Sequence, residues 1–168
     1  KNISTETLIQ SREDREIDIL PSISGAAMFF DKCNFDLVEG FDENFFLYFE
    51  ETDYCYRAKQ KGLFSYQINS IKLNHNVGTS IEYENDLEMK KIKELQIWHF
   101  IWSKIYFYKK KYGSILCYIY FTQLYLRTKF KLIIFRIQKD ENKTNKYKTR
   151  LEGMITSIKG LKSNKRID

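Results

Sequence analysis

The 168-residue sequence has a single proline and no CxxC motif. So little proline favours helices over a chain of rigid loops. Three cysteines are present (Cys33, Cys55 and Cys117), and this odd number without metal-type spacing argues against a disulfide framework. We therefore expect a reducing compartment. The start of the chain also lacks the apolar segment of a signal peptide, so we expect no secretory leader there.

Acidic residues are scarce in the second part of the chain. Residues 1–102 carry 11 basic and 18 acidic side chains, a net charge of −7, whereas residues 103–168 carry 17 basic and 4 acidic side chains, a net charge of +13. This asymmetry predicts that the second part contacts an anionic surface. We do not expect nucleic acid as the partner, because the negative first part would oppose it.

The hydrophobic pattern up to residue 81 predicts a mixed α/β segment. "SGAAMFFD" (24–31) has the length and composition of a buried strand, and "KCNFDLVEGF" (32–41) has near-helical spacing with Gly40 at its end. Residues 50–62 read as a helix with acids first, bases last and a closing glycine. "LFSYQIN" and "SIKLNH" alternate as two short strands, and residues 1–16 are polar and predicted to be loose.

From residue 82 onward the pattern is helical. It predicts long helices at 82–113 and 114–140, then a linker and a last amphipathic helix. Two apolar runs, 97–108 and 115–126, are 12 residues each, and a spanning helix needs about 20. Aromatic helices flanked by lysine and arginine suit the membrane interface, and a helical cap packed on the first part is the alternative.

The densest group of acids follows an apolar run in "FFLYFEETDYCYRA" (45–58). Glu50, Glu51 and Asp53 lie within four positions, with Arg57 one turn after Asp53. Acids at a helix start and an i, i+4 ion pair stabilise a helix, which is a sufficient structural explanation for their presence. Carboxylates beside an apolar wall are also how a protein builds a general base, so a catalytic site is the other interpretation.

Several segments in a fixed order resemble one enzyme family. The segments "SGAAMFF", "LVEGFDENFFLYFEETDYCYRAKQKG" and "SIKLNHNVGTS" resemble the C-terminal half of the catalytic domain of family 2 glycosyltransferases, especially the bacterial rhamnosyltransferase-like branch. The late "RLEGMITSIKG" resembles the last helix of such proteins. The resemblance implies an α/β fold: the C-terminal, acceptor-side part of a GT-A domain at 1–81, followed by a helical, membrane-surface extension at 82–168.

The resemblance also implies an activity: inverting transfer of a sugar from a nucleotide-diphospho-sugar to a saccharide or lipid-linked saccharide in bacterial surface polysaccharide synthesis. In that family the second acid of the block is the usual base, and this position is Glu51, where the family often has aspartate. Glu50 would orient the acceptor or tune Glu51, and the assignment between these two stays open. Asp53, grouped with the catalytic acids, would with Arg57 support the helix.

Other site residues follow from the same resemblance, each with a structural alternative. Ser24 and Gly25 would lie at the acceptor side, or pack closely as part of a strand. Phe46 and Tyr48 would wall the acceptor pocket, or belong to the core, and Arg57 is grouped with these substrate-binding residues. His75 would help hold a divalent Mg²⁺ or Mn²⁺ ion at the donor diphosphate, although a lone histidine is more often structural.

The family's nucleotide-binding half, with its Asp-x-Asp element, has no counterpart here, because no two aspartates are spaced two apart. We therefore expect a C-terminal fragment that needs a separate N-terminal half and that neither binds a donor tightly nor turns it over alone. The expected location is cytoplasmic, peripheral at the inner face of the cell membrane. The alternative function is a non-catalytic membrane-surface interaction module that retains a transferase remnant.

Overall fold

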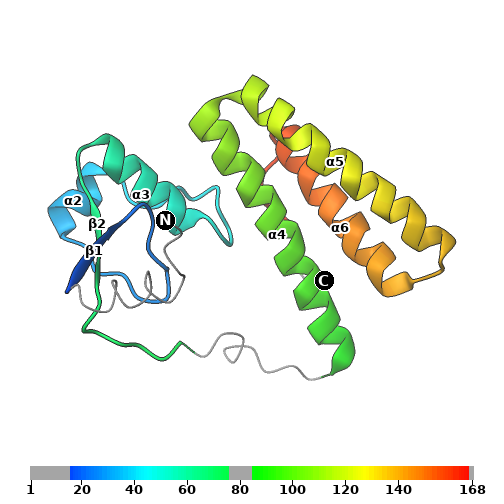
Figure 1. Ribbon diagram of the computed structural model, residues 1–168, viewed down its shortest axis with the longest axis horizontal. Coiled ribbons are helices and arrows are strands. Elements are labelled where there is room, and N and C mark those ends of the chain that lie inside the picture. The colour runs from blue at the N-terminus through cyan, green and yellow to red at the C-terminus, as the bar shows by residue number, and fades with distance from the viewer. Residues whose placement is uncertain (1–15, 76–84, 167–168) are drawn as a thin grey trace, which may run out of the picture. The chain divides into compact units, whose positions relative to one another are not determined.

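The computed structural model describes residues 16–75 and 85–166 (Figure 1), and these are mostly helical with one small sheet. The chain divides into two compact units. The first unit contains Lys1–Asp42 and Glu51–Ser80, and the second contains Glu43–Glu50 and Ile81–Asp168. The second unit resumes at Ile81, next to the predicted boundary between residues 81 and 82. The sequence did not predict that residues 43–50 belong to the second unit.

The first unit is built on a pair of helices and a two-stranded sheet. Strands β1 (Ile17–Leu20) and β2 (Ser65–Ile68) pair antiparallel, with Ile17 opposite Ile68 and Leu20 opposite Ser65. Helix α2 (Lys32–Leu37) begins where Asp31 accepts a hydrogen bond from the Asn34 amide, a normal N-cap. Helix α3 (Glu50–Gln60) supplies Tyr54, Cys55 and Ala58 to this unit's core, and Val38, which follows α2, completes it.

Two predicted strands are absent from the residues that the structure describes. Residues 24–30 form a turn and irregular chain rather than a buried strand, and Phe29 is 94% exposed. Residues 71–75 also lack strand structure, whereas β2 lies inside the predicted "LFSYQIN" strand. A strand needs a neighbour for its backbone groups, and within the described ranges only β1 and β2 pair. An apolar pattern therefore did not suffice to make residues 24–30 a strand.

The second unit contains three long helices: α4 (Asp86–Tyr112), α5 (Ser114–Ile137) and α6 (Glu141–Ile158). Asn85 caps α4, and the acids of its first turn and Lys109–Lys111 of its last turn match the helix dipole. Gly113, at φ +81°, makes the break between α4 and α5. The predicted linker after residue 140 is instead helical, because the Asp140 side chain accepts from the Lys143 amide and starts α6 at Glu141.

Helices α4 and α6 approach each other closely at Gly153. A Cβ atom placed on Gly153 would lie 2.6 Å from Cγ2 of Ile101 and 2.7 Å from the carbonyl oxygen of Trp98. The core beside this contact contains Ile101, Ile105, Cys117, Phe121 and Met154. Ser157, one turn further along α6, donates a hydrogen bond of 2.9 Å to the Trp102 carbonyl. The absence of a side chain at Gly153 therefore sets the spacing of the two helices.

Gly153→Ala is expected to destabilise the second unit by about 1–2 kcal/mol, because overpacking costs about 1–3 kcal/mol and outweighs the helix propensity that alanine gains. The comparison of Lys148→Ala with Lys148→Gly is the matched control, since Lys148 is exposed on the same helix. There alanine should be the more stable residue. Urea unfolding followed by the fluorescence of Trp98 and Trp102 measures both pairs. The prediction is wrong if alanine stabilises at both positions.

Candidate functional site

The start of α3 buries several carboxylate oxygens, and one of them belongs to Glu51. Glu51 is half-buried, and its Oε2 atom is buried with no hydrogen-bond partner among the residues that the structure describes. A Cβ atom placed on Gly25 would lie 3.8 Å from Cδ and 3.9 Å from Cγ of Glu51. The backbone at Gly25 therefore faces the Glu51 carboxyl group with no side chain between them. Gly25 belongs to the "SGAAMFF" segment and Glu51 to the "LVEGFDENFFLYFEETDYCYRAKQKG" segment, and the structure brings these two residues together.

The chain around Gly25 is fastened to α3 by side-chain hydroxyls. Ser22 Oγ donates to Thr52 Oγ1 over 3.3 Å, which joins this segment to the residue after Glu51. Ser24 is exposed, and its Oγ accepts a hydrogen bond of 3.3 Å from the Ala26 amide. Ser24 thus shapes the turn that presents Gly25. Of the two alternatives for these residues, strand packing is wrong, because no strand forms at 24–30.

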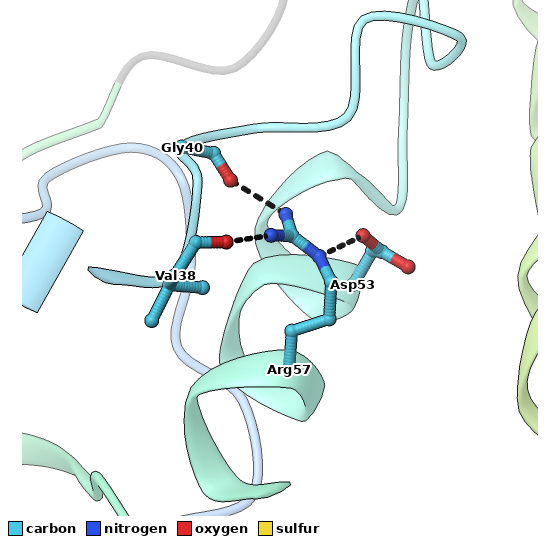
Figure 2. Close-up of polar contacts among 4 residues, drawn as sticks. All are labelled: Val38, Gly40, Asp53 and Arg57. Atoms are coloured by element: carbon cyan, nitrogen blue, oxygen red, sulfur yellow. Dashed lines mark hydrogen bonds and ion pairs between the residues drawn. The ribbon is translucent and has the colours of Figure 1, made fainter. Parts of the chain in front are cut away.

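Asp53 and Arg57 form the main polar contact of the first unit (Figure 2). Asp53 is 1% exposed, and Arg57 Nε donates to its Oδ2 atom over 2.8 Å. The other guanidinium nitrogens donate to the carbonyl oxygens of Val38 and Gly40, the second over 2.6 Å. Arg57 therefore joins α3 to the end of α2. This geometry positions the helix that carries Glu51.

The turn that offers these carbonyls depends on left-handed backbone. Glu39 and Gly40 have φ values of +65° and +61°, and the Gly40 amide donates to the Phe35 carbonyl over 3.0 Å. A Cβ atom on Gly40 would also lie 3.2 Å from the Phe35 ring. Phe35 in turn stacks on Tyr54 of α3, with ring centroids 5.5 Å apart. Ring packing and the Arg57 hydrogen bonds thus fix the same turn against α3.

Phe46 and Tyr48 belong to the second unit, whereas Gly25 and Glu51 belong to the first. Ser103 Oγ donates to the Leu47 carbonyl over 2.8 Å, which anchors this segment on α4. The Phe46 ring lies 4.8 Å from the His99 ring, and the guanidinium of Arg166 lies 3.8 Å from the Phe46 ring centroid. Phe46 is therefore held in an aromatic and cationic contact of its own unit, but at 47% exposure it does not belong to the core.

Tyr48 lines a groove that the sequence did not predict. Its ring centroid lies 5.5 Å from that of Phe100, and the groove has a volume of about 440 Å³. Lys93 from α4 and Lys146 and Arg150 from α6 supply its cationic groups. Lys146 and Arg150 were missed because the sequence pattern did not fix where the predicted linker ends and the last helix begins, whereas α6 begins at Glu141. The pair of bases at i, i+4 after a capping Asp140 was the available signal.

His75 does not lie in a metal cluster within the described ranges. It is exposed at the end of the first range, and residues 76–84 after it lie outside the described residues. Residues 16–75 and 85–166 contain no group of three or more histidine, cysteine, aspartate or glutamate side chains that could hold a metal ion. The described donor set thus does not fit a complete divalent-metal site. The metal stays a prediction that needs further ligands.

His99 is a buried titratable group of the second unit. It is 0% exposed, with Nε2 3.0 Å from the Lys165 carbonyl and Nδ1 2.8 Å from Ser163 Oγ. Because a carbonyl only accepts, Nε2 carries the proton and Nδ1 accepts from Ser163. Burial lowers the pKa of His99 below its usual range, and the nearby Arg166 and Lys165 cations lower it further, against the opposing effect of the Lys165 carbonyl. The neutral ring ties the C-terminal segment to α4.

Stability is expected to depend on pH through this ring. The pKa of His99 is lower in the folded than in the unfolded protein. The contribution of this ring to the free energy of unfolding is therefore complete above the unfolded pKa of about 6.5, and it is lost as the pH falls below that pKa. The slope is limited to about 1.4 kcal/mol per pH unit for one proton. Urea unfolding between pH 5 and 8, read by tryptophan fluorescence, should show this fall in wild type and His75→Gln. An unchanged pH profile in His99→Gln would show the assignment to be wrong.

Comparisons of the chain with protein-family models, with curated proteins and with solved structures gave no match. The architecture itself establishes an α-rich protein with a small antiparallel sheet. Within residues 16–75 and 85–166, every helix is too short or too polar to cross a lipid bilayer.

Proposed function

We propose that this chain is the acceptor-activating part of an inverting family 2 glycosyltransferase of the rhamnosyltransferase-like branch, with Glu51 as its general base. The observation that carries the proposal is the buried Oε2 atom of Glu51, which has no hydrogen-bond partner in the described part of the chain, on a side chain whose Cδ and Cγ atoms lie beside the backbone at Gly25. The motif around it and the Arg57 hydrogen bonds that hold α3 support the same assignment.

The chemistry assigned to this chain is one proton transfer. A hydroxyl of a saccharide acceptor donates its proton to the Glu51 carboxylate while its oxygen attacks the anomeric carbon of the donor sugar. The bond from that carbon to the nucleotide diphosphate breaks, the diphosphate leaves with the electron pair, and the configuration inverts. In this proposal the acceptor approaches the carboxylate past Gly25, which has no side chain to obstruct it. Donor binding belongs, in this proposal, to a GT-A nucleotide-binding half outside the chain.

Helix α5 supports a peripheral location at the inner face of the cell membrane. It contains no acidic residue and carries four bases, Arg127, Lys129, Lys131 and Arg136. Large apolar side chains are exposed along its length at helical spacing: Ile115, Ile119, Leu126, Phe130, Ile133 and Ile137. An apolar stripe flanked by cations is the pattern of a helix that lies in an anionic lipid interface. Lipid-linked saccharide acceptors would reach the enzyme there.

Co-expression tests whether this chain activates the acceptor while a separate half binds the donor. The chain is combined with a nucleotide-binding half that contains an Asp-x-Asp element, and release of nucleoside diphosphate is measured with donor, divalent metal and a saccharide acceptor. Turnover is expected only when both parts are present. Calorimetry should show no micromolar binding of a nucleotide-diphospho-sugar with Mn²⁺ to this chain alone. Such binding would contradict the proposed division between donor and acceptor parts.

A non-catalytic membrane-surface module is the second candidate, because the α5 stripe by itself explains lipid binding without chemistry. Sedimentation with anionic vesicles separates the two candidates when it is read together with the turnover assay. Vesicle binding without donor turnover in the presence of the nucleotide-binding half favours the module. Turnover that depends on this chain favours the transferase.

A further inference from the structure

The groove beside Tyr48 is built from one face each of α4 and α6. Lys93, Gln96, Ile97 and Phe100 are spaced along one face of α4, and Lys146 and Arg150 are one turn apart on α6. Its volume of about 440 Å³ lies in the range of small-ligand sites, about 300–1,000 Å³. The groove therefore accommodates a ligand of moderate size.

Charge determines which ligand the groove can accept. Lys93, Lys146 and Arg150 line it, and no acidic side chain lines it within the described ranges. None of these three bases has an ion pair among the described residues, although Lys143 and Lys165 of the same unit do. Two like charges one turn apart on α6 destabilise a helix slightly. A compact anion bound between the three bases would remove that repulsion.

The chemistry of the lining groups favours a phosphoryl group. A guanidinium presents two parallel N–H donors that match two phosphate oxygens, and the lysines add point charges. Burial, together with the nearby Glu50 carboxylate, raises the pKa of Tyr48, so its hydroxyl stays protonated as a further donor. Ile97, Phe100 and Ile101 form an apolar wall beside these groups. The groove thus offers cations, a neutral donor and an apolar surface together.

The backbone that presents Tyr48 is strained. Tyr48 and Phe49 have φ values of +68° and +71°, a left-handed conformation that residues with side chains rarely adopt. Phe49 is turned toward Phe100 and Phe107, with ring centroids 5.7 Å from each. The Ser103 hydrogen bond to Leu47 holds the preceding residue. Packing thus maintains an unfavourable backbone that presents Tyr48 to the groove, as is common at binding sites.

We propose that this groove binds a phosphate monoester or diphosphate group, held by Lys93, Lys146 and Arg150, whose apolar substituent lies against Ile97 and Phe100. The ligand is either the phosphate headgroup of a lipid or a soluble phosphate ester, since both present this chemistry. The site does not depend on the proposed transfer reaction. It contains no catalytic carboxylate, and its binding is measured without a sugar donor.

Two lysines of α6 give a matched test on the full chain. Lys146 lines the groove and Lys148 does not, and both are exposed, so Lys146→Gln and Lys148→Gln remove the same charge without disturbing the core. Calorimetry with inorganic pyrophosphate at physiological ionic strength should show affinity lowered about fivefold by Lys146→Gln and about tenfold by Arg150→Gln. Lys148→Gln should stay within about twofold of wild type. Equal effects of the two lysine substitutions would overturn the proposal.

Vesicles identify the source of the phosphate group. Phosphatidic acid in phosphatidylcholine vesicles should bind more weakly to Lys146→Gln than to Lys148→Gln if the ligand is a lipid headgroup. If only pyrophosphate binding discriminates the two variants, the ligand is a soluble phosphate ester. Absence of binding to both probes refutes the site. So does a single-stranded oligonucleotide that binds more tightly than either probe and discriminates the variants, because the partner is then a nucleic acid.

Discussion

Glu51→Gln is expected to lower sugar transfer by at least about 100-fold, because a positioned general base contributes about 10²–10⁴-fold. The substitution keeps the size of the side chain and removes its ability to take the acceptor proton. The measurement is turnover in the assembly of this chain with a nucleotide-binding half. Glu43→Gln is the control, since Glu43 is exposed and loses the same charge.

The same substitution should leave the protein as stable as wild type or more stable. The Oε2 atom of Glu51 is buried without a hydrogen-bond partner in the described residues, and an unsatisfied buried polar atom costs about 1–3 kcal/mol. Glu51→Met removes both oxygens and should raise the free energy of unfolding of the first unit. Lost transfer with retained stability indicates a functional carboxylate. Transfer near wild type would show that Glu51 is not the base.

Helix α3 could be predicted because its signals are local. The acids of its first turn, the bases Arg57 and Lys59 of its last turn and the following Gly62 all lie within the helix or directly after it. Its observed range, Glu50–Gln60, lies inside the predicted 50–62. The ion pair of Asp53 with Arg57 follows from the same i, i+4 spacing. Signals within and next to the helix were therefore enough to predict α3, which carries Glu51.

The parts that sequence reasoning missed depend on distant partners. Residues 24–30 have a strand composition, but a strand forms only where another strand supplies hydrogen bonds. Residues 43–50 belong to the second unit through contacts such as Leu47 with Ser103, a separation of 56 residues. The hydrogen bonds from Arg57 to Val38 and Gly40 likewise cross from α3 to the turn after α2. No pattern within a short window contains these pairings.

Arg57→Met is expected to destabilise the first unit by about 3–5 kcal/mol, the cost of removing one partner of a buried ion pair. Arg57 is the side chain that gives Asp53, at 1% exposure, its 2.8 Å ion pair, and it also satisfies the carbonyl oxygens of Val38 and Gly40. Methionine keeps much of the apolar stem and loses all three hydrogen bonds. Arg57→Lys should recover only part of the loss, because an ammonium cannot reproduce the planar fork.

Lys32→Met is the matched control for this prediction. Lys32 also pairs with an aspartate at i, i+4, over 2.9 Å, but its side chain is 86% exposed and that of Asp36 is 60% exposed. An exposed pair of this kind contributes about 0.3–0.5 kcal/mol. Hydrogen exchange of the α3 amides should therefore accelerate strongly in Arg57→Met and hardly at all in Lys32→Met.

The two tryptophans of the second unit separate a local effect from a general one. Trp98 and Trp102 both lie on α4, so their fluorescence reports the second unit. In Arg57→Met the urea transition seen by tryptophan should stay near that of wild type while the protection of α3 is lost. Equal losses in both signals would show that the two units unfold together. Unchanged α3 protection would show that the Arg57 hydrogen bonds do not hold the helix that carries Glu51.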